Sequence, residues 1–339
     1  MTAGSTSSSG PPGVVSEAAE RRLAHMTALE RPSPAKRMLL IANPHASTMS
    51  DRLRHLVVYA LQGRYAVEAV DTQRRGHAID LCRDAAADGF DVVVAFGGDG
   101  TVNEAANGLA GSRTALTPLP GGSNNVFAKM LGIPNDVVDA TEQLLGAADR
   151  WDPHPVDLGR ANGRWFTFAA GMGLDASVVA RVDSRPERKA RFGAWYFAGA
   201  AVATFLRRYV VGPPRLELEV GGETVRGVSV FLQNGVPYTY FNARPVNLVE
   251  GASLTSGDLA GVILTRARPY DVPTVAFRAL SGAARIARHR GVAAFAGARQ
   301  VTVRSTDGRP VPVQVDGDHI GDETEAQFAL APGALRVVS

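Results

Sequence analysis

Short apolar runs alternate with stretches of helical periodicity along the first half of the chain. Between these runs, apolar residues recur every three or four positions, as at Leu53, Val57 and Leu61, which predicts helices with one buried face. The helices expected from this spacing cover residues 53–61, 77–88, 102–109 and 125–131. The runs themselves predict buried strands over residues 38–43, 65–71, 91–96 and 115–119. Strands that alternate with such helices predict a doubly wound parallel sheet.

After about residue 150, strand patterns separated by turn residues dominate. Residues 215–234 predict a hairpin that turns at Gly221 and Gly222. Further strands are expected over residues 261–265, 299–305, 311–316, 326–331 and 335–339. Two helical stretches, near 187–209 and 272–290, interrupt them. The second half is therefore expected to be a mostly antiparallel β-sandwich.

The 339 residues are enough for two domains with sizeable cores. Residues 1–35 begin with small, polar and proline-rich sequence and are expected to form a disordered tail. We expect a doubly wound domain over 36–150 and a β-sandwich domain over 151–325. The last segment, 326–339, is expected to add a strand that packs back on the first domain.

The composition gives only weak indications of the cellular location of the protein and of its binding partners. The net charge is +3 and the sequence pI is about 9.2, a balance that suits anionic ligands or an anionic membrane surface. Cys82 is the single cysteine, which excludes a disulfide framework and favours a reducing compartment. The apolar run at 193–206 has 14 residues, whereas a membrane span needs about 20. With no secretory signal recognisable at the start, we expect a cytoplasmic protein.

The stretch FGGDGTVNEAANGLAG, residues 96–111, carries the most specific chemistry. Gly97, Gly98 and Gly100 leave the backbone bare where a strand ends and a helix begins, so a phosphate group could approach the free N–H groups. Asp99 would repel phosphate unless a cation lay between them, which implies Mg²⁺. Thr101 can cap the helix or bind a phosphate oxygen. The alternative is a tight turn in which Asp99 only caps a helix.

A second glycine-rich stretch, PGGSNN at 120–125, stands at the next strand–helix junction. Two such loops at successive strand ends would frame one crevice, which favours nucleotide binding. The chain lacks the G-x-x-x-x-G-K-[ST] pattern of P-loop enzymes. GMGLDA at 171–176 matches a dinucleotide-binding pattern, but no acidic strand end follows at the usual spacing. There, a glycine turn that lines the cleft between the domains is the favoured interpretation.

Several stretches together resemble the catalytic domain of the diacylglycerol kinase family. IANPHAS and VDTQRRGHAIDL precede VVVAFGGDGTVNEAANGL, and LPGGSNNVFAKMLGIP follows it. The likeness runs from about residue 37 to the end and includes FTFAAGMGLDA and VPVQVDGD. Bacterial lipid kinases are the most similar, and sphingosine and ceramide kinases are related. The G-G-D-G core alone is also shared by NAD kinases and phosphofructokinases.

The resemblance implies an ATP- and Mg²⁺-dependent lipid kinase that phosphorylates a lipid hydroxyl, that of diacylglycerol in the first place. Asp99 would organise the metal, and Asp318, at the family's glutamate position, would be the catalytic base, although it could equally be a turn residue. Asp258, which lies near the position of a metal-binding aspartate of the family, is the second candidate metal ligand. ATP would lie between the domains, in contact with Asn43, Thr72, Gly97, Gly98, Asp99, Gly100, Thr101 and Ser123.

Three acidic positions of the family differ here. Val126 replaces an aspartate, Ser256 or Gly257 replaces another, and Asp318 is one methylene shorter than the family's glutamate. A nucleotide- or lipid-binding protein with weakened catalysis is therefore one alternative. A kinase that acts on NAD or a sugar phosphate is another, because the G-G-D-G core is shared.

Basic residues between 181 and 208 flank the aromatic and apolar run at 193–206. Such a segment suits either an interfacial helix on anionic lipid or a core helix with solvated ends. The expected partners are ATP, a membrane lipid and the anionic inner face of the membrane, to which the protein would bind peripherally. No nucleic-acid partner is expected, and a homodimer is allowed.

Overall fold

The structure is a computed structural model. It describes residues 16–26, 35–174, 176–177, 215–241, 244–266, 268, 274, 278 and 285–339.

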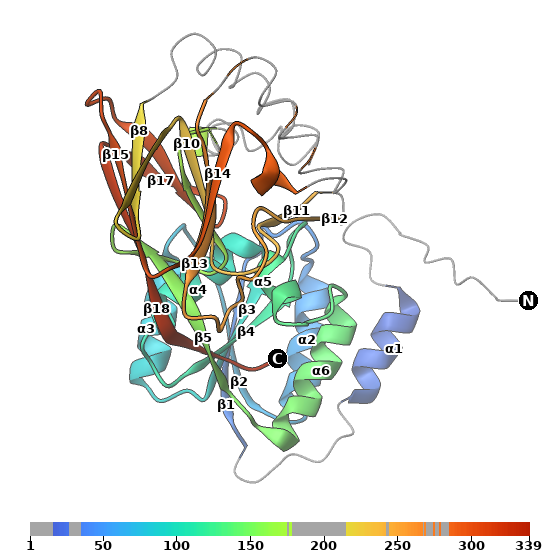
Figure 1. Cartoon of the computed structure of the whole chain (residues 1–339). Helices are drawn as coiled ribbons and strands as arrows, with labels where there is room; N and C mark the ends of the chain where they lie inside the picture. The colour runs from blue at the N-terminus through green and yellow to red at the C-terminus, as the bar shows by residue number, and fades with distance from the viewer. Residues whose placement is uncertain are drawn as a thin grey trace, which may run out of the picture.

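The first half is a parallel sheet with helices on both faces (Figure 1). Its strands, in the order β2-β1-β3-β4, are β1 (Arg37–Ala42), β2 (Ala66–Asp71), β3 (Val92–Gly97) and β4 (Ala115–Pro120). The helices are α2 (Asp51–Gln62), α3 (His77–Ala87), α4 (Asp99–Leu109), α5 (Val126–Met130) and α6 (Val137–Arg150). Neighbouring β1 residues belong to different cores, Leu39 with α3 and α4 and Leu40 with α2 and α6. The sheet is thus buried on both faces, which explains its nearly unbroken apolar strands.

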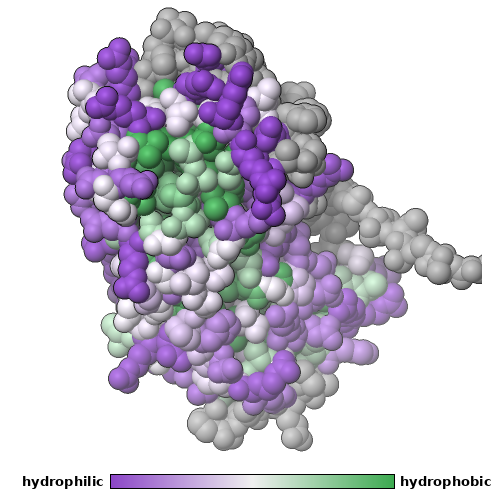
Figure 2. Space-filling model, in the orientation of Figure 1, coloured by the Kyte–Doolittle hydropathy of each residue, from purple (hydrophilic) through white to green (hydrophobic). Residues whose placement is uncertain are grey.

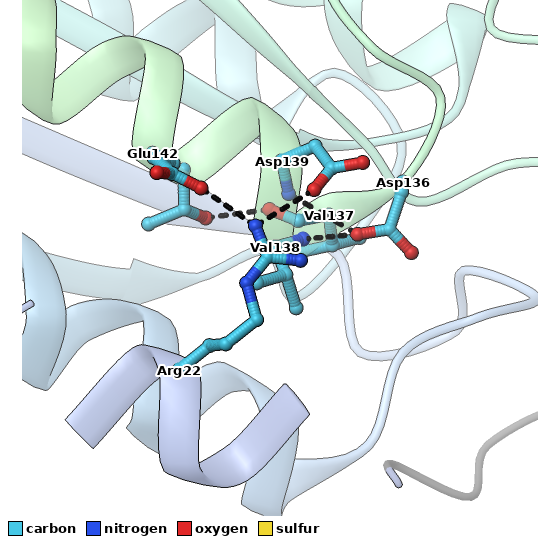
Figure 3. A network of polar contacts seen from close by, with 7 residues as sticks. Arg22, Asp136, Val137, Val138, Asp139 and Glu142 are labelled. Atoms are coloured by element: carbon cyan, nitrogen blue, oxygen red, sulfur yellow. Dashed lines mark hydrogen bonds and ion pairs between the residues drawn. The ribbon is translucent and has the colours of Figure 1, made fainter. Parts of the chain in front are cut away.

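An additional helix, α1 (Glu17–His25), lies within the segment expected to be disordered. Leu23 is fully buried there, and α1 packs on α2 and α6. Arg22 reaches Asp139 at 3.0 Å and Glu142 at 2.6 Å on α6 (Figure 3). The expectation of disorder was wrong for these residues because a mostly polar helix is held by docking, which local composition does not reveal.

The long C-terminal strand β18 (Glu325–Val337) joins the two halves. It pairs parallel with β4 through Val337 and Leu116, and antiparallel with β5 (His154–Ala161) and β15 (Gln300–Ser305). The two strands expected over 326–331 and 335–339 form one strand with a register shift between Ala331 and Leu335. The first sheet continues through β6 (Arg164–Phe166), β8 (Leu216–Val220) and β9 (Glu223–Gly227).

A second, antiparallel sheet packs on this extension, so the expected β-sandwich is confirmed. In sheet order, its strands are β14 (Val292–Ala298), β13 (Leu259–Leu264), β10 (Ser229–Gln233), β7 (Ala169–Met172), β16 (Val311–Val315) and β17 (Asp318–Glu323). Met172 and Phe328 contribute to the core between the sheets. Two short strands, β11 (Thr239–Phe241) and β12 (Arg244–Val246), form a separate pair, and Ile286–Arg288 form a 3₁₀ turn.

The packing of the β-sandwich explains two glycine-containing segments of this half, the turn at Gly221 and Gly222 and the GMGLDA segment. The hairpin turns at Gly221 and Gly222 as expected, but the strand after it splits near Val228, so that β9 and β10 belong to different sheets. In GMGLDA, a Cβ on Gly173 would lie 2.9 Å from the carbonyl oxygen of Val228. Strand packing therefore explains this glycine, and β7 lies in the antiparallel sheet, unlike the strand of a dinucleotide-binding motif.

Among the helices that the structure describes, none is long and apolar enough to cross a membrane. The apolar run 193–206 and the helix expected over 187–209 lie outside the described residues, as does most of the stretch 272–290.

Candidate active site

The two glycine loops lie against each other at the carboxyl ends of β3 and β4. The Gly121 N–H donates to the Gly97 carbonyl at 2.8 Å. A Cβ on Gly122 would lie only 2.7 Å from the Gly98 Cα, and one on Gly121 would lie 3.0 Å from the Gly97 Cα. These glycines are thus needed for the loops to pack backbone to backbone. At Gly100 a Cβ would meet nothing closer than 3.8 Å, so that position leaves space for a ligand.

The other residues expected to contact ATP gather at the same edge of the sheet. Asn43 follows β1, and its Nδ2 donates to the Thr101 Oγ1 at 3.2 Å. Thr72 follows β2, and its N–H donates to the Ala42 carbonyl at 2.8 Å. Ser123 is exposed on the second loop, which Asn125 closes through two hydrogen bonds with Gly122. Parallel strands end together at this edge, and for that reason residues far apart in sequence become neighbours.

Asp99 stands in the first turn of α4, but its carboxyl reaches the start of α5. Oδ1 accepts the Phe127 N–H at 3.4 Å, so Asp99 does cap a helix, although not its own. Burial raises the pKa of Asp99 to about 7, and the charge of Asp316 adds to the rise. Lys129 opposes it, and its Nζ lies 4.3 Å from the centre of the Tyr240 ring. A carboxyl that titrates near neutrality can be ionised by a nearby cation.

The possible metal ligands near Asp99 fit a metal ion that binds together with a nucleotide better than an ion that the protein holds by itself. Among the residues that the structure describes, no group of three or more His, Cys, Asp or Glu could hold a metal. Mg²⁺ usually takes one or two carboxylates together with waters and substrate phosphates, and Asp99 beside the glycine loops fits that pattern. The Asp258 Oδ2 lies 3.9 Å from the Cβ position of Gly297 in β14. The described contacts do not link Asp258 to Asp99, so its role as a ligand stays a prediction.

Asp318 brings the second half of the chain to the glycine loops. Its Oδ2 lies 3.8 Å from the Cβ position of Gly100, in the first turn of α4. Its Oδ1 lies 3.4 Å from Nη2 of Arg75, which follows Thr72 in the loop after β2. Asp318 begins β17 and keeps part of its surface exposed. A carboxylate from the other half of the chain thus faces the first turn of α4, and its role as a catalytic base stays a prediction.

Two acidic residues, Asp316 and Glu104, hold this region together through hydrogen bonds that the sequence did not predict. Asp316, two residues before Asp318, accepts hydrogen bonds from Asn103, Thr167, Phe168 and Ala169. Burial raises the pKa of Asp316, and these hydrogen bonds oppose the rise.

Glu104 on α4 accepts the N–H groups of Gly76 at 2.7 Å and Ala78 at 3.3 Å, and so caps α3 and ties the Arg75 loop to α4. In the sequence, only the position of Glu104 within the GGDGTVNE stretch indicated that this residue could matter for the site.

The chain is similar to known diacylglycerol kinases in sequence and in fold. Residues 37–161 match the model of the diacylglycerol kinase catalytic domain. Diacylglycerol kinase from Bacillus subtilis (strain 168) is 31% identical over 73% of this chain and 80% of its own length. The enzyme from Staphylococcus aureus (strain JH9) is 27% identical over 68% of this chain and 71% of its own.

A solved structure from Bacillus anthracis str. Sterne, provisionally assigned as a diacylglycerol kinase, has the same fold. It superposes with a TM-score of 0.72 at 22% identity, over 90% of this chain and 95% of the other. With the paired glycine loops, the sequence likeness leads to one conclusion: the chain belongs to the diacylglycerol kinase family and carries its catalytic domain.

Proposed function

We propose that the protein transfers the γ-phosphoryl group of ATP to the hydroxyl of a membrane lipid, with diacylglycerol as the acceptor. One observation carries the proposal: the Asp318 carboxylate of the second half faces the first turn of α4, beside the packed glycine loops. The proposed phosphate cradle and the proposed base therefore lie next to each other. The family relationship supports the reaction class.

The first half would bind the nucleotide. The free N–H groups at the start of α4, together with the helix dipole, favour the phosphates, and Asn43, Thr72 and Ser123 lie at the same edge. Mg²⁺ bound to the triphosphate and met by Asp99 would neutralise charge on the transferred group.

The second half would supply the acceptor and its base. Asp318 would take the proton of the lipid hydroxyl while the new O–P bond forms and the bond from the γ-phosphorus to the bridging oxygen breaks, so that ADP leaves. The upper part of Figure 2 shows an apolar patch on the surface of the β-sandwich, and this patch supports an apolar acceptor. Binding to an anionic membrane surface belongs to the same proposal.

The test offers purified protein labelled ATP, Mg²⁺ and a total lipid extract, and identifies the species that gains phosphate. We expect labelled phosphatidic acid, and Asp99→Asn should abolish the label. Labelling of soluble NAD or a sugar phosphate, with lipids ignored, would contradict the lipid assignment. Equal labelling by the variant would remove Asp99 from the mechanism.

A binding protein with weakened catalysis is the second candidate. Val126, where the family has an acid, is 1% exposed and belongs to an apolar core, so the position offers no metal ligand. Calorimetry that shows ATP binding, without lipid product after long incubation in Mg²⁺ or Mn²⁺, would favour this candidate.

A further inference from the structure

A buried polar cluster joins α4 to the turn that precedes Asp318. Asn103 is fully buried and lies one helical turn after Asp99. Its Nδ2 donates to the Asp316 Oδ2 at 2.8 Å and to the Trp165 carbonyl at 2.9 Å. Its Oδ1 accepts from Arg164 at 2.8 Å. One side chain of the phosphate-loop helix thus reaches the C-terminal half through three contacts.

Asp316 is held so closely that its position fixes the turn. Its oxygens accept the Thr167 N–H at 2.6 Å, the Thr167 hydroxyl at 2.8 Å and the Phe168 and Ala169 N–H groups at 3.0 and 2.9 Å. Asp316 has a φ of 49° and the following Gly317 one of 82°, which is the conformation that sends the chain back as β17. Because β17 starts at Asp318, the Asp316 carboxyl also locates the candidate base.

Among the described hydrogen bonds of Asp316, the one donated by Asn103 comes from α4. The other partners of Asp316 come from residues 167–169, which belong to the same half as the turn itself. Arg75 also reaches Asp318, but Arg75 is 67% exposed and the distance is 3.4 Å, so this ion pair contributes little to position. Without Asn103 the turn would stay intact within its own half but would lose its buried tie to the phosphate loop.

We propose that Asn103 is a positioning residue for phosphoryl transfer, which acts through Asp316 to hold Asp318 over the first turn of α4. This inference rests on the proposed function. Asn103 touches neither the nucleotide loops nor the acceptor in this scheme, and so its loss should affect the chemical step and spare ATP binding.

The test compares Asn103→Ala with Asn107→Ala, one turn further along α4. Asn107 also bridges α4 and β6, because it donates to the Trp165 carbonyl at 3.0 Å and accepts the Trp165 N–H at 3.0 Å. It donates to the Asn103 Oδ1 at 3.1 Å as well, but none of its described hydrogen bonds reaches Asp316. For Asn103→Ala we expect kcat for lipid phosphorylation to fall about 100-fold, the cost of a misplaced catalytic group. Its Kd for ATP, measured by calorimetry, should stay within about threefold of the wild type. Asn107→Ala should keep both values.

A second variant guards against a simple folding defect. Asn103→Asp has the same shape and still accepts from Arg164, but when ionised it cannot donate to Asp316 and places a like charge against it. We expect the same loss of kcat at pH 8 with ATP binding preserved. Wild-type kcat in either variant at position 103, or equal losses in Asn103→Ala and Asn107→Ala, would overturn the proposal. Absence of lipid phosphorylation by the wild type would instead defeat the proposed function.

Discussion

The two halves of the chain build their parts of the site in opposite ways. The glycine loops after β3 and β4 are made of backbone, and their contact leaves no room for a Cβ on Gly122. The turn at 316–318 is made by side chains, because one buried carboxyl gathers donors from α4 and from residues 167–169. Added atoms should therefore damage the first region, whereas lost hydrogen-bonding atoms should damage the second.

The comparison is tested most strongly at Asp318. Asp318→Asn keeps the shape but removes the proton acceptor, so kcat for lipid phosphorylation should fall by about 10²–10⁴-fold. The Kd for ATP should hardly change, since the proposed nucleotide contacts lie in the other half. Asp318→Glu restores the residue that the family has and should retain substantial activity. A normal kcat in the asparagine variant would leave Asp318 as a turn residue.

Gly122→Ala tests the backbone-built region. Because the new Cβ would lie 2.7 Å from the Gly98 Cα, the loops must separate, and the Kd for ATP should rise at least about tenfold. We expect a stability cost of about 1–3 kcal/mol from the crowding. The control is Gly146→Ala in α6, where a Cβ meets nothing within 4 Å. There the same substitution should stabilise by about 0.5–1 kcal/mol, as measured by urea unfolding.

Sequence patterns predicted what depends on neighbours along the chain. The strand ends of the parallel sheet, the two glycine loops and the hairpin at Gly221 follow from local turn chemistry and periodicity. The partners of Asp316 did not follow, because Asn103 lies 213 residues away and Thr167 lies 149 away. The change of sheet near Val228 likewise has no local pattern. The resemblance located Asp318, but only the tertiary structure shows how the turn is held.

The two halves can also be compared through the pH dependence of stability, because each contains a carboxyl whose pKa is raised by burial, Asp99 in the first and Asp316 in the second. The pKa of Asp99 is about 7 in the folded chain and about 4 in the unfolded chain. The folded state binds more protons between these values, so its stability should fall as pH rises from about 4 to about 7. The loss is at most about 4 kcal/mol. Asp99→Asn should remove this slope and be more stable than the wild type at pH 8 in EDTA.

Asp316→Asn should have the opposite effect on stability at pH 8, although burial raises the pKa of Asp316 as well. In the wild type the Asp316 carboxylate accepts the N–H groups of Thr167 and Phe168, whereas the amide nitrogen of the variant would face at least one of them without accepting it. The free energy of unfolding of the variant should therefore be lower by about 3 kcal/mol or more at pH 8. Chemical unfolding of both variants between pH 4 and pH 8 makes the measurement. Parallel behaviour of the two variants would show that the hydrogen bonds of Asp316 do not set it apart from Asp99.

The smallest effect is expected where a polar contact is exposed. Arg22 on α1 meets Asp139 and Glu142 (Figure 3), and the three side chains are 48–61% exposed. The pair of Asn103 and Asp316 is buried in contrast. Water and salt screen exposed pairs, so Arg22→Ala should leave the midpoint of thermal unfolding and kcat unchanged within error. Leu23→Ala, beside it, removes a fully buried side chain and should cost about 2–4 kcal/mol. A larger effect at Arg22 than at Leu23 would mean that charge rather than apolar packing docks α1, and that exposure does not decide which polar contacts matter.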